Sequence, residues 1–166
     1  MIKTKRLVIK EFIEEDLNDI AYILVNKEIA KTYMIPDFEN QEQVNKLANR
    51  FIELSNGDKK FLNGVFLNNK VIGFVNEVDK CEDSIEIGYV IHPDYKNQGY
   101  ATEMFEAVIQ EMFNRGIKKV KAGFFSHNIA SKRVMEKCGL KKVDFEEDIE
   151  YKGVIHHCIY YEISND

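Results

Sequence analysis

Hydrophobic positions follow two different periods along the chain. In four segments they recur at intervals of three and four residues, the spacing that gathers apolar side chains on one face of an α-helix. The expected helices cover residues 17–24, 41–54, 100–115 and 129–137. Other segments are short, rich in β-branched and aromatic residues and bounded by turn-forming residues, which is typical of β-strands. The expected strands cover residues 6–12, 61–67, 71–78, 84–92, 118–125, 140–149 and 156–163.

The order of these elements, β-α-α-β-β-β-α-β-α-β-β, gives the expected fold class. Asn68-Asn69-Lys70 separates two strands by a short polar turn, which is a hairpin signal and implies antiparallel pairing. The strand, long helix and next strand between residues 84 and 125 instead indicate a crossover connection. We therefore predict an α/β (α+β) fold with a mixed, mostly antiparallel sheet of about seven strands and four helices. A length of 166 residues predicts one domain, over residues 1–166.

The composition, with 45% hydrophobic and 31% charged residues, is typical of a soluble globular protein. No apolar run approaches the roughly 20 residues of a membrane span, and Leu7-Val8-Ile9 is too short for the apolar region of a signal peptide. Cys81, Cys138 and Cys158 are scattered, with no CxxC pair and no zinc-ligand spacing. These features predict a cytoplasmic protein with reduced cysteines, no metal site and no membrane partner.

The net charge of −5 results from 28 acidic and 23 basic residues. Proteins that bind nucleic acid usually carry a basic surplus, so we expect no nucleic-acid partner. The same balance is compatible with a cationic substrate. Nothing in the sequence indicates an oligomeric state.

The segment from Glu86 to Glu103 carries the clearest chemical signal. A strand runs into a short loop that contains Gly99, and a long helix begins immediately afterwards. The first turn of a helix offers backbone N–H groups and the positive end of the helix dipole, and glycine lets a ligand approach the backbone closely. Neither GxxxxGK[ST] nor GxGxxG is present, so the nucleotide-binding fingerprints do not apply. The segment fits a phosphate site, with a plain tight turn before a helix as the alternative.

Four motifs follow one another along the chain. They are Thr4-Lys-Arg-Leu-Val-Ile-Lys10, Lys96-Asn-Gln-Gly-Tyr-Ala101, Gly99-Tyr-Ala-Thr-Glu103 and Asn128-x-Ala-Ser-x-Arg-Val-Met-Glu-Lys-x-Gly-Leu140. The second resembles the [QR]-x-x-G-x-[GA] acetyl-CoA motif of the GNAT superfamily of N-acetyltransferases, with Lys96 in place of glutamine or arginine. The others resemble the Rim-type (RimJ/RimL-like) branch, which acetylates the N-termini of ribosomal proteins. The resemblance extends over residues 4–163.

The resemblance implies how acetyl-CoA would bind as cosubstrate. In the family it lies where the fourth and fifth strands of the sheet splay apart. The backbone N–H groups that would hold its pyrophosphate belong to Gln98, Gly99, Tyr100, Ala101 and Thr102, with the positive charge of Lys96 nearby. The backbone of Tyr89, Val90 and Ile91 would pair with the pantetheine arm, and one of these N–H groups would polarise the thioester carbonyl.

The implied reaction is direct attack of a neutral amine on the thioester in a ternary complex. Glu86 is the expected general base, or else a surface carboxylate paired with a neighbouring strand. Asn128 would bind pantetheine or position the amine, or serve as a helix N-cap, and Ser131 would approach the thiol or lie on the helix surface. Met135 stands where many relatives have a tyrosine, which leaves the general acid open. A thiolate with a pKa of about 8.5 can leave without full protonation.

Two other chemistries are less favoured. Cys138 has no histidine beside it and is interpreted as a small core residue rather than a covalent nucleophile. His156 and His157 point to opposite faces of a strand and cannot easily share a metal ion.

The acceptor stays open. The Rim-type likeness favours a protein N-terminal amine, but a polyamine, amino acid or aminoglycoside is equally compatible. The acidic residues of the run 146–150 would suit a polyamine, although we interpret them as a solvated turn. A non-catalytic acyl-CoA-binding module is the alternative from another class.

Overall fold

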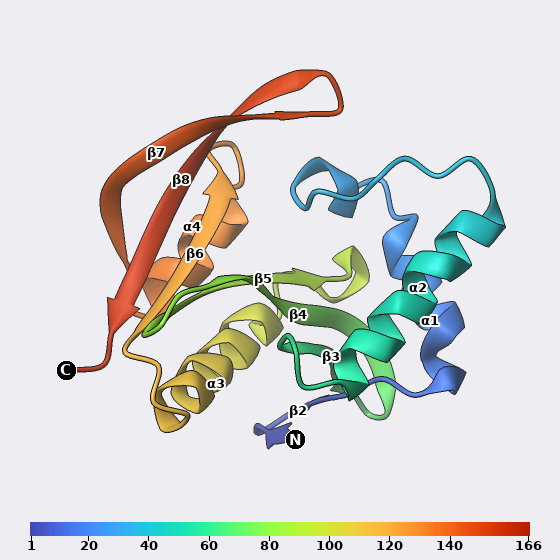
Figure 1. Ribbon diagram of the computed structural model, residues 1–166, viewed down its shortest axis with the longest axis horizontal. Helices are drawn as coiled ribbons and strands as arrows, with labels where there is room; N and C mark the ends of the chain where they lie inside the picture. The colour runs from blue at the N-terminus through green and yellow to red at the C-terminus, as the bar shows by residue number, and fades with distance from the viewer. The chain divides into compact units, whose positions relative to one another are not determined.

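The computed structural model describes residues 1–166, which form four α-helices and eight strands. The helices are α1 (Leu17–Leu24), α2 (Gln41–Asn56), α3 (Tyr100–Asn114) and α4 (Ile129–Lys137), with 3-10 turns at Glu14–Asp16, Ile29–Lys31 and Pro93–Tyr95. The strands are β1 (Ile2–Lys3), β2 (Leu7–Lys10), β3 (Leu62–Leu67), β4 (Lys70–Lys80), β5 (Ser84–Ile91), β6 (Lys119–Phe125), β7 (Lys141–Tyr151) and β8 (Val154–Ser164). All the helices and strands expected from the hydrophobic pattern are present (Figure 1). None of the helices combines the length and apolar character needed to cross a membrane.

The strands form one sheet in the order β1-β2-β3-β4-β5-β6-β8-β7. β5 and β6 pair in parallel, whereas β1–β2, β2–β3, β3–β4, β6–β8 and β7–β8 pair antiparallel. The predicted mixed α/β fold is confirmed, with eight strands instead of about seven. The additional strand is β1, in which Ile2 pairs with Ile9 and Lys3 with Val8. Two residues are too few to show the alternation by which a strand is recognised in a sequence.

The parallel pair β5–β6 is short. β6 pairs with β8 along its whole length, from Lys119 to Phe125. With β5 it pairs over three residues only, so that Ser84–Glu86 face Lys119–Lys121. This early end of the ladder agrees with the expected divergence of the fourth and fifth strands, which are β5 and β6 once β1 is counted.

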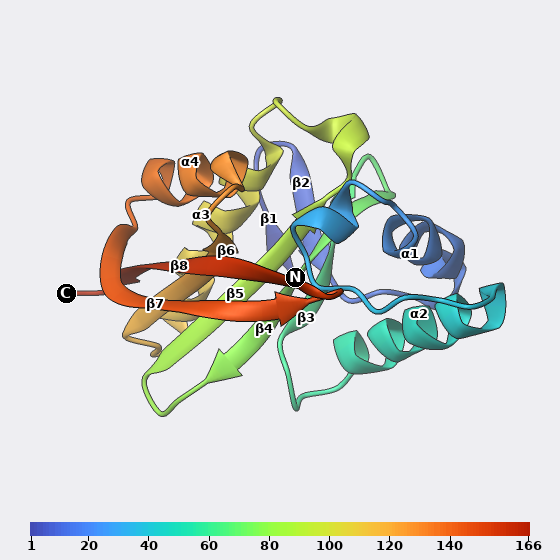
Figure 2. The same ribbon diagram turned by 90° about the horizontal axis from the view of Figure 1, so that it is seen from above.

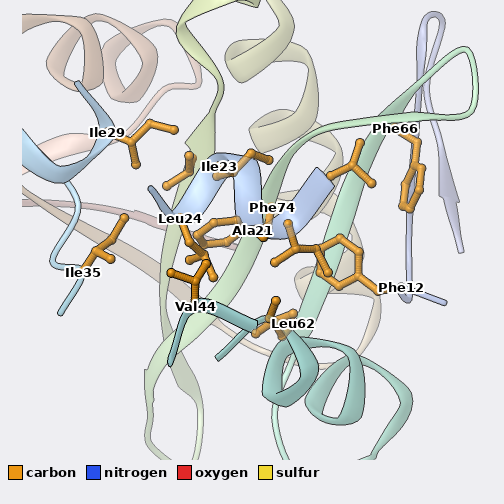
Figure 3. Close-up of a cluster of buried hydrophobic side chains, with 14 residues drawn as sticks. Phe12, Ala21, Ile23, Leu24, Ile29, Ile35, Val44, Leu62, Phe66 and Phe74 are labelled. Atoms are coloured by element: carbon orange, nitrogen blue, oxygen red, sulfur yellow. The ribbon is translucent and has the colours of Figure 1, made fainter. Parts of the chain in front are cut away.

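Two compact units make up the chain. Unit 1 contains residues 1–76 and 89–104, and unit 2 contains residues 77–88 and 105–166. In unit 1, α1 packs against α2, and α2 packs against β3 (Figures 1 and 2). Their apolar faces bury a cluster drawn in Figure 3, which includes Phe12, Ile20, Leu24, Val44, Ala48, Leu62, Phe66 and Phe74. One domain over residues 1–166 stays a prediction.

In unit 2, β7 and β8 form a long hairpin at the orange and red end of the chain (Figure 1). Lys152 and Gly153 connect them, and both have positive φ angles, as a two-residue hairpin turn requires. The acidic residues of the run 146–150 are exposed but lie inside β7, so the expected strand 140–149 is confirmed and the interpretation of the run as a turn was wrong. β7 is the last strand of the sheet order. Exposed charges are common on such edge strands, and in a sequence they resemble a turn.

Candidate functional site

The loop and first turn of α3, residues 96–103, are called here the α3 junction. Asn97 and Gly99 have φ angles of 61° and 81°, in the left-handed region that favours glycine. The carbonyl oxygen of Gly99 accepts the N–H of Glu103 at 3.0 Å, the first hydrogen bond of the helix. The loop residues 96–99 are exposed to solvent. Because the first N–H groups of a helix have no partner within it, the α3 junction has the geometry of an anion site.

Arg6, in the turn before β2, contacts the α3 junction through three groups. Its Nη1 donates to the carbonyl oxygen of Gln98 at 2.9 Å, and its Nε donates to Glu103 Oε2 at 2.7 Å. The guanidinium carbon lies 4.3 Å from the centre of the Tyr100 ring. Sequence reasoning missed Arg6 as a site residue, because Arg6 and Glu103 belong to separate motifs. The only indication in the sequence was that one motif contains an arginine and the other a glutamate, which could form an ion pair.

Tyr89, Val90 and Ile91 form the end of β5 in unit 1. The Val90 side chain is buried in the core cluster of this unit, whereas its two neighbours are half-buried. The strand ends at His92, whose N–H donates to the carbonyl oxygen of Ile72 at 2.7 Å and whose Nδ1 accepts the N–H of Asp94 at 3.1 Å. The strand expected over residues 84–92 thus ends within one residue of the observed β5. The backbone of 89–91 is therefore held on a buried, well-anchored strand.

Glu86 lies in unit 2, opposite Lys121 of β6 in the parallel pair. Burial raises the pKa of its half-buried carboxyl above the usual range for a glutamate. The negative charges of Asp79 and Glu147 raise this pKa further, and Lys121 acts in the opposite direction. A carboxylate with a raised pKa binds a proton more strongly, which is what a general base near neutral pH requires.

The name Glu86 group is used here for three side chains: Glu86, Glu147 and Tyr160. The Tyr160 hydroxyl donates to Glu147 Oε2 at 2.9 Å. Burial raises the pKa of this hydroxyl, and hydrogen bonds with Cys158 and Glu147 add to the effect, so that Tyr160 stays protonated. The Tyr160 ring lies over Gly123, its register partner on β6, where a Cβ would approach the ring to 2.5 Å.

Sequence reasoning did not single out Tyr160. Its contact with Glu147 depends on how β8 aligns with β6 and β7, which no local pattern shows. The one available signal was a glycine within the predicted strand 118–125, because glycine in a strand interior often marks a close approach by a large neighbour.

Asn128 and Ser131, also in unit 2, contact each other at the start of α4. Asn128 Oδ1 accepts the Ser131 N–H at 3.2 Å, and Asn128 Nδ2 donates to Ser131 Oγ at 2.9 Å. Asn128 is therefore the N-cap of the helix, as its position predicted. The same contact brings the amide and the hydroxyl of the two candidate residues together.

Two residues of α4 and its end exclude specific chemistries. Met135, at the position of the family's tyrosine, is buried and has no proton to donate. Burial raises the pKa of the Cys138 thiol to about 12. A thiol protonated at neutral pH is a poor nucleophile, which argues against a covalent acyl-enzyme. Cys138 is partly exposed, and not fully buried as a core residue would be.

The two adjacent histidines of β8 contact different groups. His156 stacks on Phe125 with ring centroids 4.3 Å apart, whereas His157 Nδ1 lies 2.8 Å from Asp148 Oδ1. No group of three or more His, Cys, Asp or Glu side chains is arranged to hold a metal ion.

Comparison with known proteins gives a family match over most of the chain. The family model described as an acetyltransferase (GNAT) domain matches residues 6–141. The uncharacterized N-acetyltransferase YnaD of Bacillus subtilis is 30% identical over 156 residues, which are 92% of this chain and 89% of that protein.

Solved structures share the fold. An acetyltransferase of the GNAT family from Bacillus anthracis has a TM-score of 0.84 at 25% identity and covers 98% of this chain and 97% of its own. RimL, a ribosomal L7/L12 alpha-N-protein acetyltransferase in complex with coenzyme A, has a TM-score of 0.82 at 17% identity, with coverages of 97% and 95%. Spermidine N-acetyltransferase from Vibrio cholerae, in complex with CoA and spermine, has a TM-score of 0.79 at 18% identity, with coverages of 96% and 95%.

Proposed function

Since the chain belongs to the GNAT family of acetyl-CoA-dependent N-acetyltransferases, we propose that it acetylates the α-amino group at a protein N-terminus. The motif Gly99-Tyr-Ala-Thr-Glu103 carries this proposal, because it resembles that of the Rim-type branch, which acetylates the N-termini of ribosomal proteins. Similarity of the fold to RimL, which acts on a protein N-terminus by its name, supports the same acceptor.

In this proposal the α3 junction binds the pyrophosphate of acetyl-CoA. The donors are the backbone N–H groups of Gln98, Gly99, Tyr100, Ala101 and Thr102. The left-handed φ of Gly99 supports this role, because it turns the chain into the helix without a side chain in the way. Lys96 supplies a point charge, which lacks the planar fork of arginine but still attracts phosphate.

The backbone of Tyr89, Val90 and Ile91 holds the pantetheine arm as an added strand would. One N–H group of this segment donates to the thioester carbonyl and stabilises the oxyanion that forms on attack. The anchoring of β5 at His92 supports a fixed geometry here, since a preorganised donor needs no rearrangement during the reaction.

Glu86 acts as the general base in the proposed mechanism. The attacking amine must be neutral, and an α-amino group with a pKa of about 7.7–8.0 is partly protonated at neutral pH. The raised pKa of the Glu86 carboxyl favours proton transfer from the amine, directly or through a water molecule.

Asn128 and Ser131 are proposed to act on the pantetheine, the amine and the thiol. The proposed role of Asn128 is to orient the pantetheine or the amine, in addition to capping α4. Ser131 Oγ accepts a hydrogen bond from Asn128 Nδ2. The proposed role of the Ser131 hydroxyl is to solvate the departing thiolate, in place of the tyrosine that Met135 replaces.

A polyamine is the second candidate acceptor. Besides burial, the negative charges of Asp79 and Glu147 raise the pKa of the Glu86 carboxyl in unit 2, and such a set of carboxylates would attract a polycation. The fold similarity to a spermidine N-acetyltransferase supports this alternative.

Thiol release from acetyl-CoA separates these candidates. The assay offers peptides that begin with Ser or Ala, the same peptides with acetylated N-termini, spermidine, free amino acids and an aminoglycoside. The proposal predicts release with the free peptides only. Release with spermidine alone would support the second candidate, and acetyl-CoA binding without any release would support a binding module.

A further inference from the structure

Several hydrogen bonds join Glu103 to Arg6 and Thr4 in unit 1. Glu103 Oε1 accepts the backbone N–H of Arg6 at 2.8 Å and the Thr4 hydroxyl at 2.7 Å, while Oε2 accepts Arg6 Nε at 2.7 Å. Both carboxylate oxygens are thus bound by the chain segment that precedes β2. The Glu103 side chain is 18% exposed and that of Arg6 39% exposed, so the pair is shielded more than an ordinary surface ion pair.

The same guanidinium also fixes the loop before α3. Nη1 donates to the Gln98 carbonyl, and the guanidinium carbon lies over the Tyr100 ring. A Cβ built on Gly99 would lie 3.3 Å from Arg6 Nη2, so the side chain fills the space beside the glycine. Arg6 therefore contacts Gln98 and Tyr100 and lies beside Gly99, three consecutive residues whose backbone N–H groups are proposed pyrophosphate donors.

The negative charge of Glu103 would be unfavourable beside a diphosphate bound at the α3 junction. Glu103 lies in the first turn of α3, where a diphosphate would also bind. Although burial alone would raise the pKa of Glu103, hydrogen bonds from Thr4 and Arg6 hold it below the usual range, so the carboxyl is ionised. An unpaired carboxylate there would repel the phosphates, and the paired one does not.

We propose that Arg6 is a positioning residue for acetyl-CoA, which holds residues 98–100 in the anion-binding conformation and neutralises Glu103 beside the diphosphate. This inference rests on the proposed function of the α3 junction. It concerns the diphosphate only, since Arg6 contacts none of the residues proposed to hold the pantetheine arm or the acetyl group. A substrate without a diphosphate should therefore not depend on Arg6.

The test compares acetyl-CoA with S-acetylpantetheine, which has the same thioester and no diphosphate. For Arg6→Ala we expect the acetyl-CoA dissociation constant, measured by calorimetry, to rise about tenfold or more, since charge-assisted hydrogen bonds are lost. The KM for S-acetylpantetheine and the kcat at saturating acetyl-CoA should stay within about twofold. Arg6→Lys keeps the charge but not the planar fork of arginine, so its acetyl-CoA dissociation constant should lie between those of the unaltered protein and Arg6→Ala. Arg6→Ala/Glu103→Gln should bind acetyl-CoA more tightly than Arg6→Ala, because the unpaired charge is gone.

Arg115→Ala is the matched control, because Arg115 pairs with Glu111 at 2.8 Å at the other end of α3. It should leave acetyl-CoA binding unchanged. Equal acetyl-CoA affinity of Arg6→Ala and the unaltered protein would overturn the inference, and so would an equal loss with both substrates, which indicates a merely structural role. If Arg6→Ala does not fold, the same comparison with Arg6→Lys decides. Failure of the unaltered protein to bind acetyl-CoA would instead contradict the proposed function.

Discussion

The α3 junction and the Glu86 group are built in different ways. The α3 junction consists of consecutive residues, and its chemistry comes from backbone N–H groups, a left-handed glycine and the start of a helix. The Glu86 group takes its members from β5, β7 and β8, and its proposed chemistry comes from side chains: burial and the Glu147 charge raise the pKa of Glu86, and the Tyr160 hydroxyl donates to Glu147. A site made of backbone groups tolerates most side-chain substitutions but loses function when the backbone conformation changes. A site made of side chains loses function when one of those side chains is substituted. The two regions should therefore respond to different mutations and alter different kinetic parameters.

The largest expected effect is on the Glu86 group. Glu86→Gln removes the proposed base and keeps the size of the side chain, so kcat should fall by about two to four orders of magnitude. The acetyl-CoA dissociation constant should stay the same, because Glu86 is not a proposed donor to the cofactor. Steady-state kinetics and calorimetry measure the two quantities. Glu146→Gln, on exposed β7 and paired with Lys142, is the control that should retain full activity.

A smaller effect is expected from Gly99→Ala in the α3 junction. A side chain at φ 81° costs about 1–2 kcal/mol, and the new Cβ would also press on Arg6. Acetyl-CoA binding should weaken about tenfold, with kcat at saturation little changed. Gly116→Ala is matched, since φ is 91° and no atom lies within 4 Å of its Cβ. Gly116→Ala should lower the melting temperature but not the acetyl-CoA affinity, and an equal loss of affinity in both variants would refute the binding role of Gly99.

Substitutions of Asn128 test whether its role as the N-cap of α4 can be separated from its proposed role in catalysis. Asn128→Ala should destabilise the protein by about 1 kcal/mol, because the cap of α4 is lost. Asn128→Ser keeps a capping oxygen but not the amide that bonds Ser131 Oγ. We therefore expect Asn128→Ser to retain the melting temperature and to lose several-fold in kcat. Full activity of Asn128→Ser would leave the N-cap as the only role of this residue.

The smallest effect concerns the pH dependence. As the proposed base, Glu86 would accept a proton only when ionised, so we expect kcat to fall as the pH drops through its pKa, which lies above the usual range. Burial is the main cause of this shift, with Asp79 and then Glu147 adding to it. Glu147→Gln removes one of the two negative charges, so the acidic limb of the kcat profile should move to lower pH. Glu150→Gln, on the same strand, should leave the limb in place.

The local parts of the molecule could be predicted from the sequence. Helices α2 and α3 were expected at nearly their observed bounds, because their apolar positions recur at helical spacing and Gly57 and Gly116 stop them. The turn at Gly99 and the cap at Asn128 were likewise expected, since each depends only on neighbours in the chain. The resemblance of the motifs then identified the family.

The parts that depend on strand alignment could not be predicted. The strand β1 escaped notice because its two residues gain their structure only by pairing with β2. The acidic run of β7 was misread because exposed charge has the same appearance on an edge strand and in a turn. Tyr160 over Gly123 and Arg6 on Glu103 join residues far apart in the chain, and their meeting follows from register and packing.

The most direct test is one steady-state experiment on Glu86→Gln and Gly99→Ala, with acetyl-CoA varied and a free N-terminal peptide at saturation. The account predicts that thiol release by Glu86→Gln has a much lower kcat and an unchanged KM for acetyl-CoA. For Gly99→Ala it predicts a raised KM and a nearly unchanged kcat. Changes of the same parameter in both variants, or full activity of Glu86→Gln, would contradict the division between a cofactor-binding junction and a base-bearing group.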